Sequence, residues 1–446
     1  MIFKRTVEED LIRWKNDPYR KPLVIRGARQ TGKTTVVNTF AKNFDVYIPM
    51  NLEKSADRAY FERGLSVKQI YDLILLDRNV APQGTVLIFL DEIQKSPEAV
   101  SMLRYFYEEL PEIYVIAAGS LMEVKMEKAK VDFPTGRVEF LYMYPMSFEE
   151  YLTAAGNVKA VELLNTVPIP DYVQDSLLSL FREYMLVGGM PEAVSRFLEQ
   201  KSIASVKDVY SGLVSSFLED VNQYADNKHS ADVIRYLIET APYFASDRIT
   251  FQNFGNSGYK SNEVGDALRT LERAMLVYLR YPITSDEFPC SPDLKKKPKL
   301  QVLDIGMMNY SLGIEAEYVK GTDLNDLYNG KAAEQAVGQE LLALSSRKMV
   351  KPLFWVREKG SSNADLDFVQ ADQNRYIPIE VKSGKSGSLK SLHSFLDRSE
   401  NCDKAVRLYT GKYSVEKAVT PLGQKPYTLI NLPLFLASKI PAYYDL

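Results

Sequence analysis

The stretch that decides the fold of the first part of this chain reads Leu23-Val24-Ile25-Arg26-Gly27-Ala28-Arg29-Gln30-Thr31-Gly32-Lys33-Thr34-Thr35. Its second half fits the spacing G-x-x-x-x-G-K-[ST], which here follows an apolar strand and precedes a helical run from Lys33 to Phe40. Glycines at these positions let the backbone curl around a phosphate group, and the amide groups at the start of a helix point toward it. The pattern therefore predicts a phosphate-binding loop, and an incidental glycine-rich turn is the alternative.

The residue types in this loop predict that the phosphate belongs to ATP. We expect nine consecutive residues to contact the nucleotide: Gly27, Ala28, Arg29, Gln30, Thr31, Gly32, Lys33, Thr34 and Thr35. Lys33 is predicted to neutralise negative charge at the β- and γ-phosphates, and the hydroxyl group of Thr34 is predicted to coordinate Mg²⁺. The expected cofactors are therefore ATP and Mg²⁺.

A second apolar run, from Val86 to Leu90, ends in the two acids Asp91 and Glu92. A buried strand normally ends in paired acids only where its tip faces solvent or a metal ion. We expect Asp91 to hold the Mg²⁺ shell and Glu92 to polarise the attacking water. The alternative is that the two acids cap the next helix.

Two further polar residues are candidates for a catalytic role in the same site. Ser120 stands just beyond the apolar run from Tyr114 to Ala117, where its hydroxyl group would reach the γ-phosphate or the attacking water. Arg137 is expected to stabilise transition-state charge, either in its own chain or in a neighbouring subunit of an oligomer. A helix cap for Ser120 and a surface salt bridge for Arg137 are the alternatives.

The composition of the chain is that of an ordinary folded protein. Its 446 residues suffice for about three domains, and 46% of them are hydrophobic and 25% charged. Only two cysteines and two histidines are present, which excludes zinc fingers and disulfide frameworks. No run approaches the ~20 apolar residues of a membrane span, so we expect a cytoplasmic protein without a membrane partner.

The residue pattern divides the chain into three parts. From Lys21 to about Tyr151, short apolar strands alternate with helical stretches, which predicts an α/β domain with a parallel sheet covered on both faces. Long helical stretches follow, and a helix before the strand-like run Leu276–Leu279 indicates a winged helix. A helix from Lys331 and three strand-like runs then predict a compact α/β domain. The expected domains are residues 1–155, 156–325 and 326–446.

Several motifs together make the chain resemble prokaryotic AAA-type ATPases in which a P-loop domain is joined to a long C-terminal region of unknown function. The resemblance covers nearly the whole chain. It implies a P-loop NTPase domain with a parallel sheet, a helical winged-helix middle region and a restriction-endonuclease-like α/β terminal domain, but no settled biological role. The motifs are the phosphate-binding loop, Leu90-Asp91-Glu92, Gly119-Ser120, Gly136-Arg137, Tyr144-Pro145-Met146-Ser147-Phe148-Glu149-Glu150-Tyr151, Gly188-Gly189-Met190-Pro191 and Pro298-Lys299-Leu300-Gln301-Val302-Leu303-Asp304-Ile305-Gly306.

Four residues of the terminal part match the E…D…E-x-K pattern of the PD-(D/E)-x-K nuclease superfamily: Glu334, Asp367, Glu380 and Lys382. Residues two apart in a strand share a face, so Glu380 and Lys382 are expected to project together. The three acids are predicted to hold Mg²⁺, and Lys382 is predicted to orient water or balance phosphate charge as a catalytic residue. The alternative is a strand with alternating solvent-facing charges in an inactive scaffold.

Basic residues in the last two parts point to a DNA partner. Residues 331–446 carry 17 Lys and Arg against 12 Asp and Glu, although the whole chain has a net charge of −3. Basic side chains also lie around the candidate recognition helix and its wing, and solvated surfaces are the alternative for them. They are Lys260, Arg269 and Arg273 beside the helix, and Lys295, Lys296, Lys297 and Lys299 in the wing.

The leading functional interpretation is an ATP-binding and ATP-hydrolysing molecular switch of the AAA type that acts on or with DNA. The alternative is a non-catalytic regulatory or protein-interaction module that binds ATP and carries an inactive nuclease-like scaffold. Phosphate release distinguishes the two, because only the first hydrolyses ATP. Neither interpretation decides whether the protein has metal-dependent nuclease activity.

Overall fold

A computed structural model describes residues 1–120, 133–134, 136–314, 330–357, 364–384 and 387–446. The chain forms two compact units. Unit 1 comprises Met1–Tyr144, Arg273–Leu276 and Ser345–Met349, and unit 2 comprises Pro145–Glu272, Val277–Leu344 and Val350–Leu446. The predicted boundary between residues 325 and 326 lies outside the described residues, and the division into three domains stays a prediction. No helix in the described ranges has both the length and the apolar character that a membrane crossing needs.

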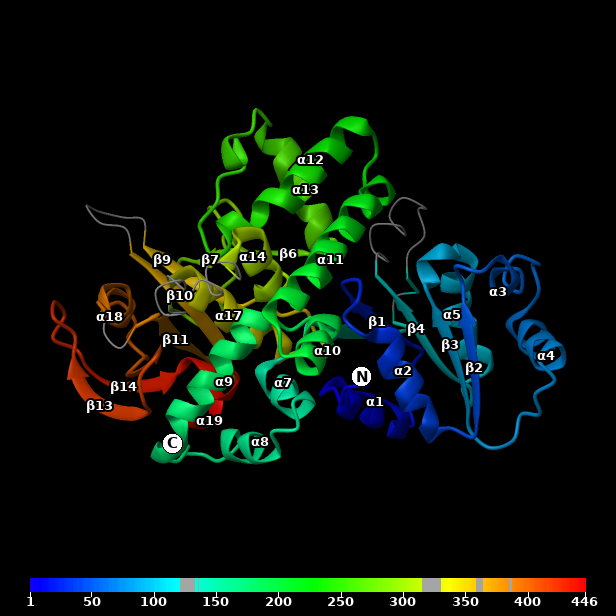
Figure 1. The fold of residues 1–446 in the computed structure, drawn as a ribbon, viewed down its shortest axis with the longest axis horizontal. Helices are drawn as coiled ribbons and strands as arrows, with labels where there is room; N and C mark the ends of the chain where they lie inside the picture. Colours follow the sequence, from blue (N-terminus) through cyan, green and yellow to red (C-terminus); the bar gives the residue numbers. More distant parts are fainter. Residues whose placement is uncertain (121–132, 135, 315–329, 358–363, 385–386) are drawn as a thin grey trace. The chain divides into compact units, whose positions relative to one another are not determined.

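Unit 1 is built on a five-stranded parallel sheet with the strand order β2-β3-β4-β1-β5 (Figure 1). The predicted parallel sheet is therefore confirmed. The apolar runs at residues 23–25, 86–90 and 114–117 each lie in one strand. The strands are β1 (Leu23–Gly27), β2 (Val46–Asn51), β3 (Val86–Asp91), β4 (Tyr114–Gly119) and β5 (Glu139–Met143).

Helices cover both faces of this sheet and enclose two apolar cores. Val24 of β1 belongs to the core that contains Ile70 of α4 and Leu103 of α5, whereas Ile25 belongs to the core that contains Leu11 of α1. This alternation follows from the two-residue period of a strand. The helices are α1 (Val7–Asn16), α2 (Lys33–Phe40), α3 (Ser55–Arg58), α4 (Val67–Asp77) and α5 (Pro97–Glu109), with the 3₁₀ turns η1 (Ala41–Asn43) and η2 (Ile93–Lys95).

Unit 2 begins with a helical region. Its long helices α9 and α11 confirm the long helical stretches expected after about Tyr151. The elements before residue 330 are α7 (Phe148–Ala154), α8 (Val158–Leu164), η3 (Asp171–Val173), α9 (Gln174–Val187), α10 (Pro191–Gln200), α11 (Ile203–Tyr224), α12 (Lys228–Thr240), η4 (Ala241–Phe244), η5 (Phe254–Asn256), α13 (Ser261–Arg273), β6 (Val277–Arg280), β7 (Pro282–Ile283), β8 (Lys299–Val302) and α14 (Ile305–Leu312).

The rest of unit 2 is a mixed seven-stranded sheet with the order β13-β14-β12-β11-β10-β9-β7 (Figure 1). The predicted α/β character of the terminal part is thus confirmed. Helix α18 packs on the sheet through Phe395, whose ring lies 5.4 Å from that of Trp355. The elements are α17 (Gly330–Ala343), β9 (Leu353–Arg357), β10 (Ala364–Asp372), β11 (Arg375–Val381), α18 (Lys390–Leu396), β12 (Lys404–Tyr409), β13 (Ser414–Val419), β14 (Pro426–Pro433), η6 (Leu434–Lys439) and α19 (Ile440–Tyr444).

Three of the motifs that carry the family resemblance meet in one buried polar network of unit 2. The Gly189 carbonyl accepts a hydrogen bond of 2.7 Å from Met146, and the Gly189 amide donates one of 2.6 Å to Asp304. Asp304 also caps α14 and accepts a bond of 2.6 Å from the Tyr210 hydroxyl group. Gly188 has a φ of +82°, and a Cβ atom there would lie 2.2 Å from that hydroxyl oxygen. These motifs therefore have a structural role in holding unit 2 together.

Candidate nucleotide site

The phosphate-binding loop connects the end of β1 to the start of α2. Gly32 adopts a left-handed conformation with a φ of 94°, immediately before the helix begins at Lys33. Gly27 is closely packed, because a Cβ atom there would lie 2.6 Å from the carbonyl oxygen of Met143. The hydroxyl group of Thr31 closes the loop by donating to the carbonyl oxygen of Ala28 at 2.9 Å. The local backbone thus has the shape that the glycine spacing predicts.

The buried side chain of Lys33 lies inside this loop. Its ammonium group donates to the carbonyl oxygens of Gly27 at 2.9 Å and Ala28 at 2.8 Å. Burial lowers the pKa of Lys33 to about 8, against the attraction of the Glu92 and Asp91 carboxylates. An ammonium group held by two neutral carbonyls in a desolvated position is well placed to exchange them for phosphate oxygens.

The two predicted magnesium ligands come together from separate elements. The hydroxyl group of Thr34, in the first turn of α2, donates to Asp91 Oδ2 at the end of β3 over 2.8 Å. Burial raises the pKa of Asp91, and the hydrogen bond from Thr34 opposes this rise. A hydroxyl and a carboxylate oxygen in contact are donors that fit Mg²⁺. These two residues would hold the ion at the carboxyl ends of the strands.

Glu92 follows Asp91 in a left-handed conformation with a φ of 53°. This conformation is uncommon for a residue with a side chain and is found often at functional sites. The carboxylate of Glu92 accepts a hydrogen bond from the Gln94 amide. It therefore has a partner that orients it beside the loop.

Ser120 and Arg137 lie at opposite ends of the parallel strands, Ser120 at the carboxyl ends and Arg137 at the amino ends. Ser120 follows β4, which pairs with both β1 and β3, so it is at the same carboxyl edge as the loop and Asp91. Arg137 precedes β5, whose first residue Glu139 is in register with the first residue of β1. A five-residue strand spans roughly 16 Å, so the structure does not bring Arg137 to the loop of its own chain.

Arg137 has a partner on the surface of unit 1. Its Nε atom donates to Glu108 Oε1 at 2.6 Å, and 41% of its side chain is exposed. The surface salt bridge is therefore the arrangement within one chain. A role for Arg137 in a neighbouring subunit stays a prediction.

Sequence reasoning missed Arg5, a buried residue that contacts the loop from the N-terminal segment. Its guanidinium group donates to the carbonyl oxygen of Thr31 at 2.9 Å and to that of Tyr144 at 2.8 Å. It thus joins the loop to the end of β5. A single arginine before a helix carries no recognisable signal in the sequence.

The four motif residues of the terminal domain converge, but protein cations lie among them. Lys299 Nζ is 2.7 Å from Glu334 Oε1 and 3.2 Å from Asp367 Oδ1, and Lys382 Nζ is 2.6 Å from Glu380 Oε1. Burial raises the pKa of Glu380 to about 8. Within the described ranges, no group of three or more acidic, histidine or cysteine side chains is arranged to hold a metal ion. The residues present therefore do not fit Mg²⁺.

The predicted basic surface is only partly exposed. Lys299 is buried in this ion cluster, so the prediction that it lies in an exposed wing is wrong. Lys295 and Lys297 are exposed in the loop before β8. On α13, Arg269 forms an ion pair of 2.7 Å with Asp266, which offsets its charge.

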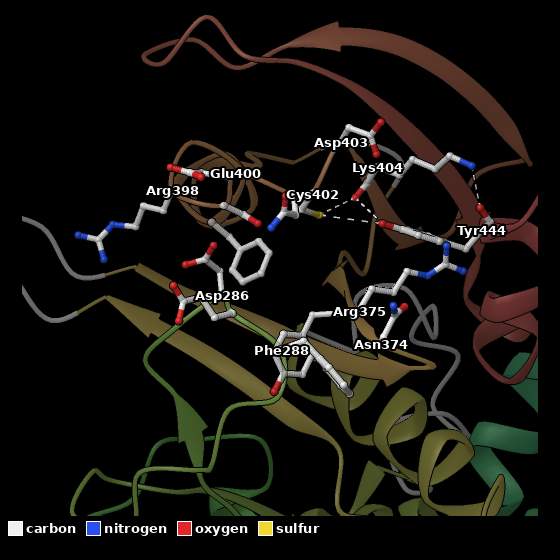
Figure 2. A pocket seen from close by; sticks show the side chains of 15 residues that line it. Asp286, Phe288, Asn374, Arg375, Arg398, Glu400, Cys402, Asp403, Lys404 and Tyr444 are labelled. Carbon is white, nitrogen blue, oxygen red and sulfur yellow. Dashed lines mark hydrogen bonds between the residues drawn. The ribbon is translucent and has the colours of Figure 1, made fainter.

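A separate polar cavity of about 390 Å³ lies between the terminal domain and residues 286–288 of unit 2 (Figure 2). None of the predicted site residues lines it. Its buried Cys402 donates to the carbonyl oxygen of Lys404 at 3.2 Å and lies 4.0 Å from the hydroxyl group of Tyr444. Burial raises the pKa of the Cys402 thiol to about 11, which makes it a poor nucleophile at neutral pH.

Comparisons with known proteins place a family on each part of the chain. Residues 19–152 match a family described as an AAA domain, and residues 178–318 and 329–425 match two domains of unknown function, DUF8612 and DUF4143. The uncharacterized protein MJ1637 of Methanocaldococcus jannaschii is 21% identical over 418 residues, which cover 88% of this chain and 82% of that protein.

Solved structures that match part of this chain include the following two proteins. The Walker-type ATPase PABY2304 of Pyrococcus abyssi has a TM-score of 0.44 and 14% identity over 70% of this chain and 96% of its own. The Aeropyrum pernix ORC2 protein has a TM-score of 0.35 and 14% identity over 71% and 96%. By its family matches and its phosphate-binding loop, the chain carries a P-loop ATPase domain of the AAA type at its N-terminus, followed by two domains of unknown function.

Proposed function

We propose that the chain binds ATP with Mg²⁺ at the loop between β1 and α2 and hydrolyses it as a molecular switch that acts on or with DNA. The observation that carries the ATP part is the 2.8 Å hydrogen bond between Thr34 and Asp91, beside the ammonium group of Lys33. It joins the loop to the acidic end of β3, which is the arrangement that P-loop enzymes use.

Each residue of the proposed site has a distinct task. Lys33 binds the β- and γ-phosphates once it leaves the carbonyl oxygens of the loop, and Thr34 and Asp91 hold Mg²⁺, which offsets phosphate charge. Glu92 orients the attacking water and accepts its proton, and Ser120 donates to the γ-phosphate or to that water. Arg137 acts only across a subunit contact, given its place at the other edge of the sheet.

Phosphate release by the full-length protein, with and without duplex DNA, tests the ATP part. Lys33→Ala is expected to weaken ATP binding by at least about tenfold, because it removes the ammonium group that meets the phosphates. Glu92→Gln is expected to keep ATP bound and to lose release, because the binding groups remain while the water loses its base. The exposed Lys42 and Glu109 supply matched controls, Lys42→Ala and Glu109→Gln.

Two outcomes would contradict this proposal. A Glu92→Gln protein that releases phosphate at the wild-type rate would remove the assigned base. A wild-type protein that binds ATP and releases no phosphate with or without DNA would favour the non-catalytic regulatory module instead.

The DNA part is supported by the order of elements around α13. Helix α12 and the 3₁₀ turn η4 are followed by an isolated bridge between Arg248 and Lys299, then by η5 and α13. The antiparallel pair β6 and β8 comes next, with the short strand β7 between them in sequence. A helix, a short extended segment, two further helical segments and a hairpin form the order of a winged helix. We therefore propose that this region contacts DNA phosphates through the exposed lysines of its hairpin loop.

Binding of a labelled duplex at several salt concentrations tests this contact. A double variant, Lys295→Glu with Lys297→Glu, is expected to bind less tightly and to show a salt slope smaller by about two, because two phosphate contacts are lost. The control double variant is Lys54→Glu with Lys68→Glu, on exposed lysines of unit 1. Equal affinities and slopes for both variants would exclude the hairpin loop as the contact.

A further inference from the structure

Six charged side chains gather where the hairpin of β6 and β8 meets the terminal sheet within unit 2. Three are basic and three are acidic, so their formal charges cancel. All three acids belong to the nuclease-like pattern, one on α17 and two on the neighbouring strands β10 and β11, whereas two of the cations come from β6 and β8. The six are Arg280, Lys299, Lys382, Glu334, Asp367 and Glu380.

Lys299 occupies the centre of this cluster. Its side chain is 7% exposed, and its ammonium group donates to Glu334 on α17 at 2.7 Å and to Asp367 on β10 at 3.2 Å. One cation thus bridges two carboxylates from different elements. The backbone of β8 holds it there, because Lys299 pairs with Arg280 of β6 and with Arg248.

Arg280 completes the charge balance from the adjacent strand. Its side chain is 1% exposed, and its guanidinium group is 3.2 Å from Glu334 Oε1 and donates to the carbonyl oxygen of Asp367 at 2.6 Å. The same group lies over the ring of Phe368, 4.0 Å from its centre. These contacts hold the buried guanidinium group of Arg280 in one position.

The remaining carboxylate oxygens are largely used as well. Asp367 Oδ2 accepts a hydrogen bond of 2.9 Å from the amide of Val381, and Glu380 Oε1 pairs with Lys382. Glu380 Oε2 is buried and makes no hydrogen bond within the described ranges. This oxygen offers one ligand, whereas Mg²⁺ needs near-octahedral coordination by oxygens at about 2.0–2.1 Å.

We propose that the ammonium group of Lys299 takes the place of a divalent metal ion between Glu334 and Asp367, so that this cluster joins the hairpin to the terminal sheet. The acids that the sequence assigns to Mg²⁺ are neutralised by the protein itself. The cluster therefore works as a fixed junction between two parts of unit 2, and this inference is independent of the proposed ATP site.

Binding of Mn²⁺ by the full-length, nucleotide-free protein tests the proposal. All proteins carry Asp91→Asn, which removes the carboxylate of the ATP site, and bound Mn²⁺ is counted by electron paramagnetic resonance. Without further change we expect no saturable Mn²⁺ site. Lys299→Met, which removes the ammonium group and leaves the carboxylates, is expected to create one site per chain and a melting temperature that rises with Mn²⁺.

Two further variants test whether a new Mn²⁺ site is formed by the carboxylates of this cluster. Lys299→Met combined with Asp367→Asn is expected to lose it. Lys331→Met removes an exposed lysine that pairs with Asp247 in the same unit, and it is expected to create no site.

Two results would overturn the proposal. One is a saturable Mn²⁺ site with Lys299 intact that disappears with Asp367→Asn. The other is a folded Lys299→Met protein that binds no Mn²⁺. If Lys299→Met does not fold with or without Mn²⁺, the measurement with Lys299 intact decides, because the proposal requires that protein to have no site.

Discussion

The buried carboxyl group of Glu340 should make the stability of unit 2 fall as the pH rises. Its side chain accepts hydrogen bonds from the Phe148 amide at 2.8 Å and from the Tyr184 hydroxyl group at 3.0 Å. Burial raises the pKa of Glu340 from an ordinary value of 4.5 to about 7, and the nearby acids Glu149 and Glu150 add to the rise. The two hydrogen bonds lower the pKa of Glu340, but by less than burial raises it.

The sign of the effect follows from proton binding. Between about pH 4.5 and 7 the folded state holds this proton and the unfolded chain releases it, so raising the pH favours unfolding. The difference in pKa corresponds to about 3 kcal/mol, at about 1.4 kcal/mol for each pH unit. The stabilisation is complete below about pH 4.5 and is lost as the pH rises through 7.

Glu340→Gln should remove this loss, because a glutamine resembles the protonated acid and keeps an oxygen that accepts both hydrogen bonds. Urea unfolding at a series of pH values measures the free energy of unfolding of both proteins. The variant should exceed the wild type by about 3 kcal/mol above pH 7 and show a flatter pH dependence. Glu162→Gln, at a side chain that is 63% exposed, is the control. A Glu340→Gln protein with the same pH slope as the wild type would refute the reasoning.

Three other predictions concern particular contacts. Arg5→Ala should lower the free energy of unfolding by about 2 kcal/mol and weaken ATP binding, because the carbonyl oxygens of Thr31 and Tyr144 lose their buried donor; unchanged affinity in a nucleotide titration would contradict this. Gly188→Ala should cost at least about 2 kcal/mol in calorimetry, because the new Cβ would clash with Tyr210, and an unchanged melting temperature would speak against the contact. Ellman's reagent at about pH 8 should modify Cys290 well before the buried Cys402, whose pKa is raised to about 11, and equal rates would disprove the assignment.

The sequence by itself determined the parallel sheet and the phosphate-binding loop. Both depend on local patterns, namely uninterrupted apolar runs and one contiguous motif from Gly27 to Thr34. The meeting of Thr34 and Asp91 was also predictable, because the carboxyl ends of parallel strands lie at one edge of the sheet. Helix α17 and the strands β9, β10 and β11 of the terminal domain were recognised by the same kind of local pattern, whereas β12, β13 and β14 were not predicted.

Only the tertiary structure decided which charges pair. Lys299 belongs to a lysine-rich run that is typical of a solvated loop, yet it is buried against Glu334 and Asp367, which lie 35 and 68 positions away. Arg137 precedes a strand whose register puts it far from the loop, and Arg5 reaches the loop from the first residues of the chain. Such pairings depend on which strands are neighbours and which ends face each other. No spacing along the chain encodes that, because hydrogen bonds and ion pairs act over a few ångströms in space, whatever the separation in sequence.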